Sequence, residues 1–84
     1  MNLNKQNLIN KILYRSQYRG TKEMDKFVSS FVNSLIYHLS FNELKDLDKL
    51  IDLNDEDIIR IYNNQNLTNI NPKIIEKLRR FKLN

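Results

Sequence analysis

The chain has 84 residues, a net charge of +4, and neither cysteine nor alanine. A chain of this length forms one domain with a small core, here residues 1–84, and without cysteine it has neither disulfides nor thiolate metal sites. No run approaches the roughly 20 apolar residues that span a membrane, and the amino-terminal segment lacks the apolar core of a secretory signal, so we expect an intracellular protein without membrane insertion.

The first two predicted helices flank Gly20, the only glycine of the chain. Apolar residues at three-and-four spacing predict a helix over about residues 4–18 and a second, more apolar one over about residues 21–39. Glycine adopts the left-handed conformation after a helix at little cost, so Gly20 would let the chain reverse between the two helices. The apolar faces consist of Leu8, Ile9, Ile12 and Leu13, and of Met24, Phe27, Val28, Phe31, Leu35, Ile36 and Leu39.

Two further helices are predicted from their caps. Ser40 and Glu43 have the spacing of a capping box, in which serine and glutamate each bind the other's main-chain N–H, so a helix starts there and runs to about Ile51. Asn54 can cap a short helix over residues 55–62 in the same way. The residues expected to be buried are Leu44, Leu47, Leu50, Ile51, Ile58, Ile59, Ile61 and Tyr62.

The last predicted helix covers about residues 72–81. Asn71 followed by Pro72 is a cap with proline at the first helical position, and the expected buried residues are Ile74, Ile75, Leu78 and Phe81. No stretch alternates like a strand, and no segment repeats. The sequence therefore predicts an all-α fold, a compact bundle of five short helices. Because alanine is absent, packing must hold these helices.

The chain offers few groups for catalysis. His38 is its only histidine, and a lone histidine cannot form a metal site. One glycine is too few for a glycine-rich phosphate loop. The acids Asp55, Glu56 and Asp57 lie at a predicted helix start, where they suit the helix dipole better than acid–base catalysis. We expect a protein that is not an enzyme and that holds no metal.

The charged turn around Gly20 is the candidate site. Arg15 and Arg19 are four residues apart and share one helix face, and Glu23 emerges from the next helix. Arginine binds carboxylates through two parallel hydrogen bonds, and glycine lets a partner approach the main chain, which favours a docking surface. A solvated charged turn with glycine as its cap explains the same residues equally well. The candidate partner-binding residues are Arg15, Tyr18, Arg19, Gly20, Lys22, Glu23 and Asp25.

The four tyrosines have two interpretations. Tyrosine is often half-buried at a core edge with its hydroxyl in water, and we expect this for most of them. Tyrosine is also enriched at the centres of interfaces. Tyr14 and Tyr18 lie beside the charged turn and are the best interface candidates; the others are Tyr37 and Tyr62.

The segment "LYRSQYRGTKEMD" resembles the RGxxE signature of the succinate dehydrogenase assembly factors, small flavinylation factors of bacteria and mitochondria. Arg19, Gly20 and Glu23 fill the motif, and Asp25 matches the acid that commonly follows it. The segment "LSFNELKDLDKLIDLNDEDI" and the last helix are also similar, so nearly the whole chain is covered. There are two departures: Ile61 stands where the family usually has tryptophan, and "NNQNLTNINP" replaces a loop that often reads glycine-lysine-proline.

This resemblance implies a non-enzymatic assembly factor. It would bind the flavoprotein subunit of succinate dehydrogenase, or of fumarate reductase, and promote covalent attachment of FAD to a histidine of that subunit. Arg19, Gly20 and Glu23 would lie against the partner near its flavin, and the factor would favour the partner conformation in which attachment is faster. It would hold no cofactor stably, since FAD is bound by the partner. It would be monomeric when free, in the bacterial cytoplasm or the mitochondrial matrix.

Other interaction classes stay open. Residues 1–22 hold five bases and no acid, and residues 72–84 hold five bases and one acid, which suits a nucleic-acid-binding protein. Seven acids against three bases in residues 40–60 weaken that alternative, although sequence order does not say which segments meet in space. A basic amphipathic first helix suits a membrane surface, but the core needs its apolar residues. An antitoxin-type interaction protein is a further alternative.

Overall fold

Five α-helices make up most of the computed structural model, which describes residues 3–65 and 69–83. They are α1 (Leu3–Ser16), α2 (Lys22–Leu35), α3 (Phe41–Ile51), α4 (Asp55–Tyr62) and α5 (Pro72–Arg80), with a short 3₁₀ turn at Ile36–His38. No strand occurs among the described residues. The predicted all-α bundle of five short helices is therefore confirmed.

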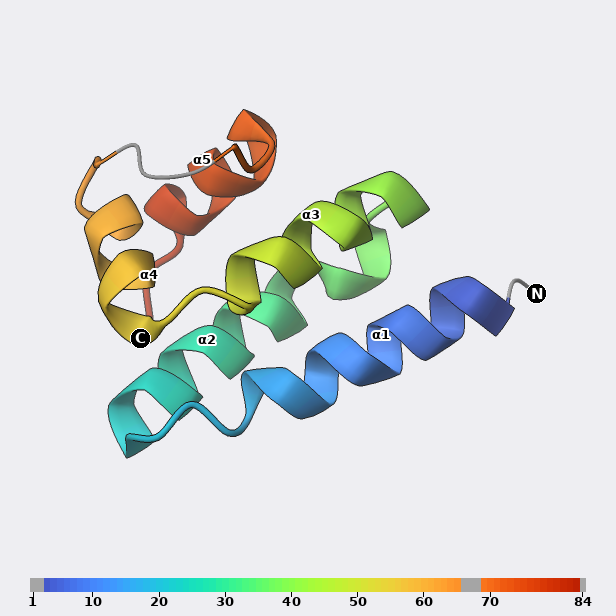
Figure 1. The fold of residues 1–84 in the computed structure, drawn as a ribbon, viewed down its shortest axis with the longest axis horizontal. Coiled ribbons are helices and arrows are strands. Elements are labelled where there is room, and N and C mark those ends of the chain that lie inside the picture. Colours follow the sequence, from blue (N-terminus) through green and yellow to red (C-terminus); the bar gives the residue numbers. More distant parts are fainter. Residues whose placement is uncertain (1–2, 66–68, 84) are drawn as a thin grey trace.

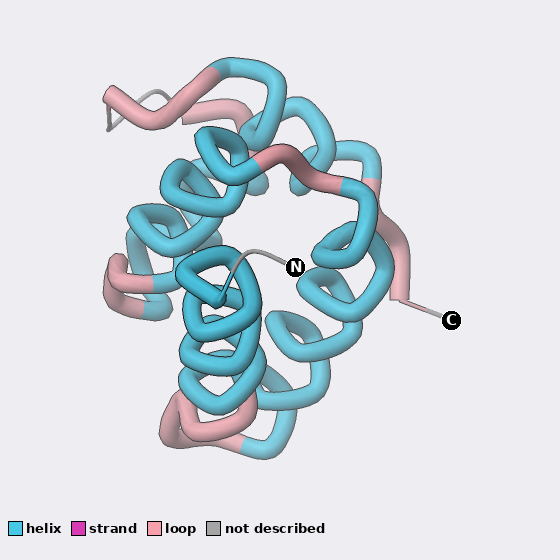
Figure 2. The backbone as a smooth tube through the Cα atoms, turned by 90° about the vertical axis from the view of Figure 1, so that its right-hand side faces the viewer, coloured by secondary structure: helices cyan, strands magenta, loops and turns pink. Residues whose placement is uncertain are grey.

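The helices are arranged around α1 and α2. In Figure 1, α1 lies beside α2, which runs back against it, and beside α3, which runs in the same direction as α1. The shorter helices α4 and α5 pair with each other near the far end of α3. Seen along α1, the helices surround a common interior (Figure 2). The α1–α2 turn and the α3–α4 connection thus come to the same end of the bundle.

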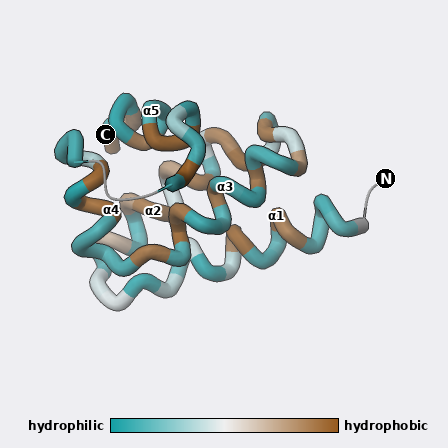
Figure 3. Tube along the Cα trace, turned by 45° about the horizontal axis from the view of Figure 1, so that its top comes forward, coloured by the Kyte–Doolittle hydropathy of each residue, from teal (hydrophilic) through white to brown (hydrophobic). Residues whose placement is uncertain are grey.

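All five helices contribute to the core. Hydrophobic positions recur along each helix, shown in brown in Figure 3, and the most buried of them come from one face of each element. Burying such side chains drives folding in a chain whose helices lack alanine. Fully buried examples are Ile12, Val32, Ile36, Leu44, Leu47, Ile61 and Ile74.

Most helix starts are those that the caps predict. Ser40 and Glu43 form the complete capping box, with the Ser40 N–H donating to the Glu43 carboxylate at 2.9 Å and the Glu43 N–H donating to the Ser40 hydroxyl at 3.2 Å. Asn54 accepts from the Asp57 N–H at 2.8 Å, and Asn71 accepts from the Lys73 N–H at 2.9 Å. These bonds satisfy donors that a helix cannot satisfy itself.

The second helix ends earlier than expected. The α-helix stops at Leu35, and Ile36–His38 form a 3₁₀ turn, whereas the periodicity predicted helix as far as Leu39. Tightening of the last turn is common at helix ends. Here it keeps Ile36 buried and leaves Leu39 extended, with φ −93° and ψ 146°, so that Leu39 enters the core directly before the Ser40 cap.

Three smaller expectations are wrong. The first helix ends at Ser16 rather than at residue 18, and the fully buried Ser16 hydroxyl donates to the Leu13 carbonyl at 2.8 Å. The last helix ends at Arg80, one residue early. Ile59 is 46% exposed, because Ile58 and Ile61 already fill the inward face of α4.

No described helix has both the length and the hydropathy needed to cross a membrane.

The capping box predicts a pH dependence of stability. Hydrogen bonds from Ser40, first from its main-chain N–H, hold the pKa of the Glu43 carboxyl below its ordinary value of 4.5, with Lys77 and Lys73 adding to the effect. A carboxyl with a depressed folded-state pKa contributes stability above its unfolded pKa and loses it as pH falls through the folded value.

We therefore expect the advantage of the wild type over Glu43→Gln in the free energy of unfolding to be fully present near pH 6 and to shrink as the pH falls below the ordinary carboxyl pKa of 4.5, as measured by urea unfolding. An advantage that is constant over this range would contradict the assignment.

Candidate functional site

The Arg19 side chain links the α1–α2 turn to residues 51–55, in the middle of the chain. It is only 10% exposed, and its Nε donates to the Asp55 carboxylate at 3.0 Å. Its two terminal nitrogens donate to the carbonyls of Ile51 and Leu53. Ile51 is the last residue of α3, and helix ends leave carbonyls without partners. Arg19 therefore joins the turn to the α3–α4 connection.

A docking surface that uses Arg19 requires its guanidinium to face outward, and this expectation is wrong, since the group binds acceptors of its own chain. Three acceptors of its own chain converge on it, and a planar fork with five N–H donors suits such a set better than solvent does. Residue types could not indicate this arrangement, because two of the acceptors are main-chain carbonyls more than 30 residues away. Whether Arg19 contributes to binding a partner stays a prediction.

Two bases of α1 also pair with acids, of which Asp48 lies in α3 and Asp52 directly follows it. Lys11 and Arg15 both bind the Asp48 carboxylate, at 3.1 Å and 2.8 Å, and Arg15 also binds Asp52. Together with Arg19 and Asp55, these residues form what we call the ion ladder.

The ion ladder shows which charged segments of the chain meet in space, which sequence order alone does not say. The bases are four residues apart along the chain and the acids follow one another at spacings of four and three, so that bases and acids meet in the same order. This order fits the parallel course of α1 and α3 in Figure 1. The basic amino-terminal segment thus lies against the acidic middle of the chain.

Asp25 closes the turn from the other side. Its carboxylate accepts the main-chain N–H of Arg19, and its own N–H donates to the Thr21 carbonyl at 2.9 Å. Thr21 in turn caps α2 by accepting the Met24 N–H at 3.1 Å. Arg15, Arg19 and Asp25, three of the candidate partner-binding residues, are thus engaged within the chain.

The other candidates face solvent. Gly20 has φ +121°, and a Cβ built on it would meet nothing within 4 Å, so the main chain there is open. Lys22 and Glu23 are exposed, and neither forms an ion pair within the described residues. We call residues 18–23 the corner. It presents main chain and a carboxylate outward, whereas its guanidinium points inward.

Exposed aromatic rings adjoin the corner. Tyr14 and Tyr18 are exposed, with ring centroids 5.0 Å apart. The half-burial expected for most tyrosines is wrong for these two and for Tyr37, which is also exposed. Tyr62 does lie at the core edge, and its hydroxyl donates to the Phe81 carbonyl at 2.9 Å. The corner therefore has an aromatic surface on its α1 side.

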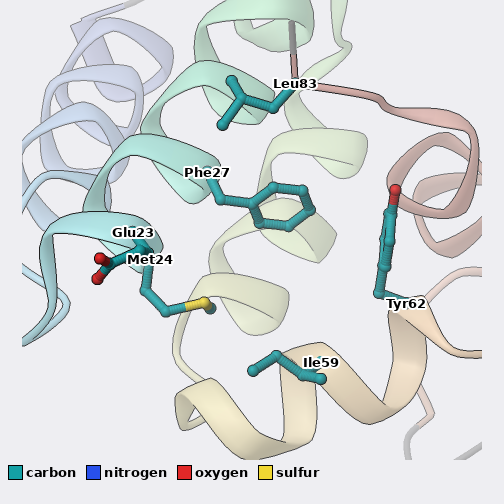
Figure 4. A pocket seen from close by; sticks show the side chains of 6 residues that line it. All are labelled: Glu23, Met24, Phe27, Ile59, Tyr62 and Leu83. Atoms are coloured by element: carbon teal, nitrogen blue, oxygen red, sulfur yellow. The ribbon is translucent and has the colours of Figure 1, made fainter.

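An apolar hollow adjoins the corner on its α2 side, and sequence reasoning did not find it. It has a volume of about 330 Å³ and lies between the first turns of α2, the outer face of α4 and the carboxyl-terminal segment. Figure 4 shows its lining, which is Glu23, Met24, Phe27, Ile59, Tyr62 and Leu83. One feature of the sequence could have indicated the hollow: Ile59 is apolar although its position lies next to the buried face of α4 and not on it.

No described group of three or more histidine or acidic side chains could hold a metal ion.

The fold and the corner define a small all-α protein whose charged helix–turn–helix leaves a glycine main chain and a carboxylate open to a partner. Comparison with known families agrees: residues 10–82 match the Sdh5 family, described as flavinator of succinate dehydrogenase. The chain belongs to this family. No curated protein and no solved structure matches the chain.

The role of Arg19 in the fold predicts a large loss of stability on its removal. Arg19→Ala leaves the Asp55 carboxylate and two carbonyls without their donor, so we expect the free energy of unfolding to fall by about 2–4 kcal/mol. Arg19→Lys should recover only part of this, because an ammonium lacks the planar fork. Urea unfolding followed by circular dichroism measures both.

Arg15→Ala is the matched control. Its side chain is 30% exposed and its acceptors reach solvent, so we expect a loss of about 1 kcal/mol or less. Equal losses in the free energy of unfolding for Arg15→Ala and Arg19→Ala would contradict the conclusion that Arg19 is the stronger link between the turn and the rest of the fold.

Proposed function

We propose that this chain binds the flavoprotein subunit of succinate dehydrogenase, or of the related fumarate reductase, and promotes covalent attachment of FAD to that subunit. The observation that carries the proposal is its membership of a family described as flavinator of succinate dehydrogenase, together with the open Gly20 main chain and exposed Glu23 at the corner.

Each corner residue has a distinct role in this proposal. Gly20 lets the partner approach the main chain, since no side chain stands above it. Glu23 accepts hydrogen bonds from donors of the partner, because no described cation of its own chain is paired with it. Lys22 and Tyr18 flank this contact. Arg19 acts as a positioning residue, and Arg15 and Asp25 support it from within the chain.

The factor works by binding rather than by chemistry. A partner that exchanges between two conformations shifts toward the one that the factor binds more tightly. Here the favoured conformation is the one in which the flavin and the acceptor histidine of the partner react faster. FAD stays with the partner, and this chain, monomeric when free, holds no cofactor stably. The bacterial cytoplasm or the mitochondrial matrix would be its compartment.

The ion ladder bears on the alternative of nucleic-acid binding. Three of the five bases in residues 1–22 are paired with acids of α3 and α4. Paired bases release few counterions from a phosphate backbone, and counterion release is the main source of such affinity. The carboxylates beside them repel phosphate as well. This face of the protein is thus poorly suited to nucleic acid.

The most direct test removes the Glu23 carboxylate while the fold stays intact. Glu23→Ala removes an exposed side chain without an ion pair, so we expect a change in the free energy of unfolding of about 0.5 kcal/mol or less. We expect flavinylation of the partner subunit to fall at least tenfold. Covalent flavin is measured as fluorescence of the partner band on a denaturing gel.

Glu76→Ala is the control, because it also removes an exposed carboxylate, here one paired with Arg80 on α5. It should flavinylate like the wild type. Gly20 is a poorer test, since its positive φ would strain any other residue by about 1–3 kcal/mol. Full flavinylation with a folded Glu23→Ala protein would refute the proposal.

A further inference from the structure

The hollow beside the corner is shaped by aromatic side chains. The Phe27 and Tyr62 rings meet edge to face, with centroids 5.2 Å apart, and Phe81 lies behind them with its ring centroid 5.7 Å from that of Phe27. Such contacts fix the rings in place. Figure 4 shows the Met24 side chain extending toward Ile59 and the Phe27 ring toward Tyr62. The hollow is thus formed before any partner arrives.

The rim of the hollow carries apolar surface that the fold does not bury. Ile59 is 46% exposed and Leu83 is 41% exposed, and both belong to the few large hydrophobic residues of the chain that face solvent. They come from α4 and from the segment after α5. Apolar surface rimmed by a polar residue, here Glu23, is typical of an interaction site.

The polar groups of the hollow argue against a small polar ligand. The Tyr62 hydroxyl already donates to the Phe81 carbonyl. The Glu23 carboxylate turns away from Ile59 and Tyr62 in Figure 4, although its side chain lines the rim. Small-molecule sites need a few converging polar groups that fix orientation. An apolar side chain that projects from a protein surface needs none.

We propose that the hollow receives an apolar side chain of the flavoprotein subunit, next to a basic residue of that subunit that pairs with Glu23. This rests on the proposed function. The volume is sufficient, since an apolar cavity of about 150 Å³ holds benzene and the hollow has about 330 Å³. An anchor side chain in such a pocket is the usual centre of an interface.

Two observations favour the flavoprotein subunit as the occupant: the hollow adjoins the corner, and the Glu23 carboxylate lies at its rim. Glu23 and Met24 are consecutive in the first turn of α2, so the hollow begins where the corner ends. A protein that contacts Gly20 and Glu23 is therefore close enough to reach Met24 and Ile59 as well. The Glu23 carboxylate at the rim has no ion-pair partner among residues 3–65 and 69–83, which favours a basic neighbour of the anchor. A second copy of this chain is a different occupant, and self-association distinguishes it.

The test measures binding of the purified flavoprotein subunit by titration calorimetry. Ile59→Asn and Leu83→Ser remove apolar rim surface from two separate segments, and each side chain is exposed enough for the fold to survive. We expect each to weaken binding about tenfold or more. Ile59→Val, which keeps most of the apolar surface, should stay within about threefold of the wild type.

Tyr37→Ser is the matched control. It removes an exposed aromatic side chain outside the hollow and should bind within about twofold of the wild type. Thermal unfolding of each variant verifies the fold, so that a loss of binding can be assigned to the rim.

Three results would overturn the inference. If Glu23→Ala loses binding while Ile59→Asn and Leu83→Ser bind like the wild type, the hollow is not part of the interface and the proposed function stands. If the rim variants abolish self-association of this chain instead, measured by analytical ultracentrifugation, a second copy covers the hollow. If the wild type does not bind the subunit, the proposed function fails together with the inference.

Discussion

The ion ladder, which joins α1 and the turn after it to residues 48–55, is the interaction on which the rest of the structure depends. It joins the first helix to residues more than 30 positions later, and its last member, Arg19, satisfies two main-chain carbonyls as well as Asp55. A chain of 84 residues has a small core, so a charge as nearly buried as that of Arg19, with all its partners in place, matters more than it would in a larger domain. The acids of the ladder also offset much of the basic charge of α1.

With Arg19 held inward, the neighbouring residues are free to face a partner. Gly20 leaves its main chain open, Glu23 stands exposed at the start of α2, and the apolar hollow begins one residue later at Met24. In the proposed function, the three letters of the RGxxE motif thus divide into a positioning residue, Arg19, and two residues that would contact the partner, Gly20 and Glu23. A rigid scaffold beneath a binding loop lowers the entropy cost of association.

The sequence was sufficient for the helix starts that local caps determine, but not for the ends of α1, α2 and α5. The Ser40–Glu43 box and the caps at Asn54 and Asn71 act over two or three residues, and each starts its helix as predicted. The features that sequence reasoning missed depend on the assembled bundle. The acceptors of Arg19 are main-chain groups without a signal in residue type, and the exposure of Ile59 depends on which α4 residues fill the core first. The positive φ of Gly20 was expected and found, because its cause is local.

A thermodynamic double-mutant cycle on Arg19 and Asp55 tests the central claim most directly. The free energies of unfolding of Arg19→Ala, Asp55→Ala and the double variant are measured in urea and compared with the wild type. If the ladder holds the corner on the α3–α4 connection, the two losses overlap, with a coupling energy of about 1 kcal/mol or more. Losses that add to within about 0.3 kcal/mol would mean that the two side chains act independently and would contradict the account.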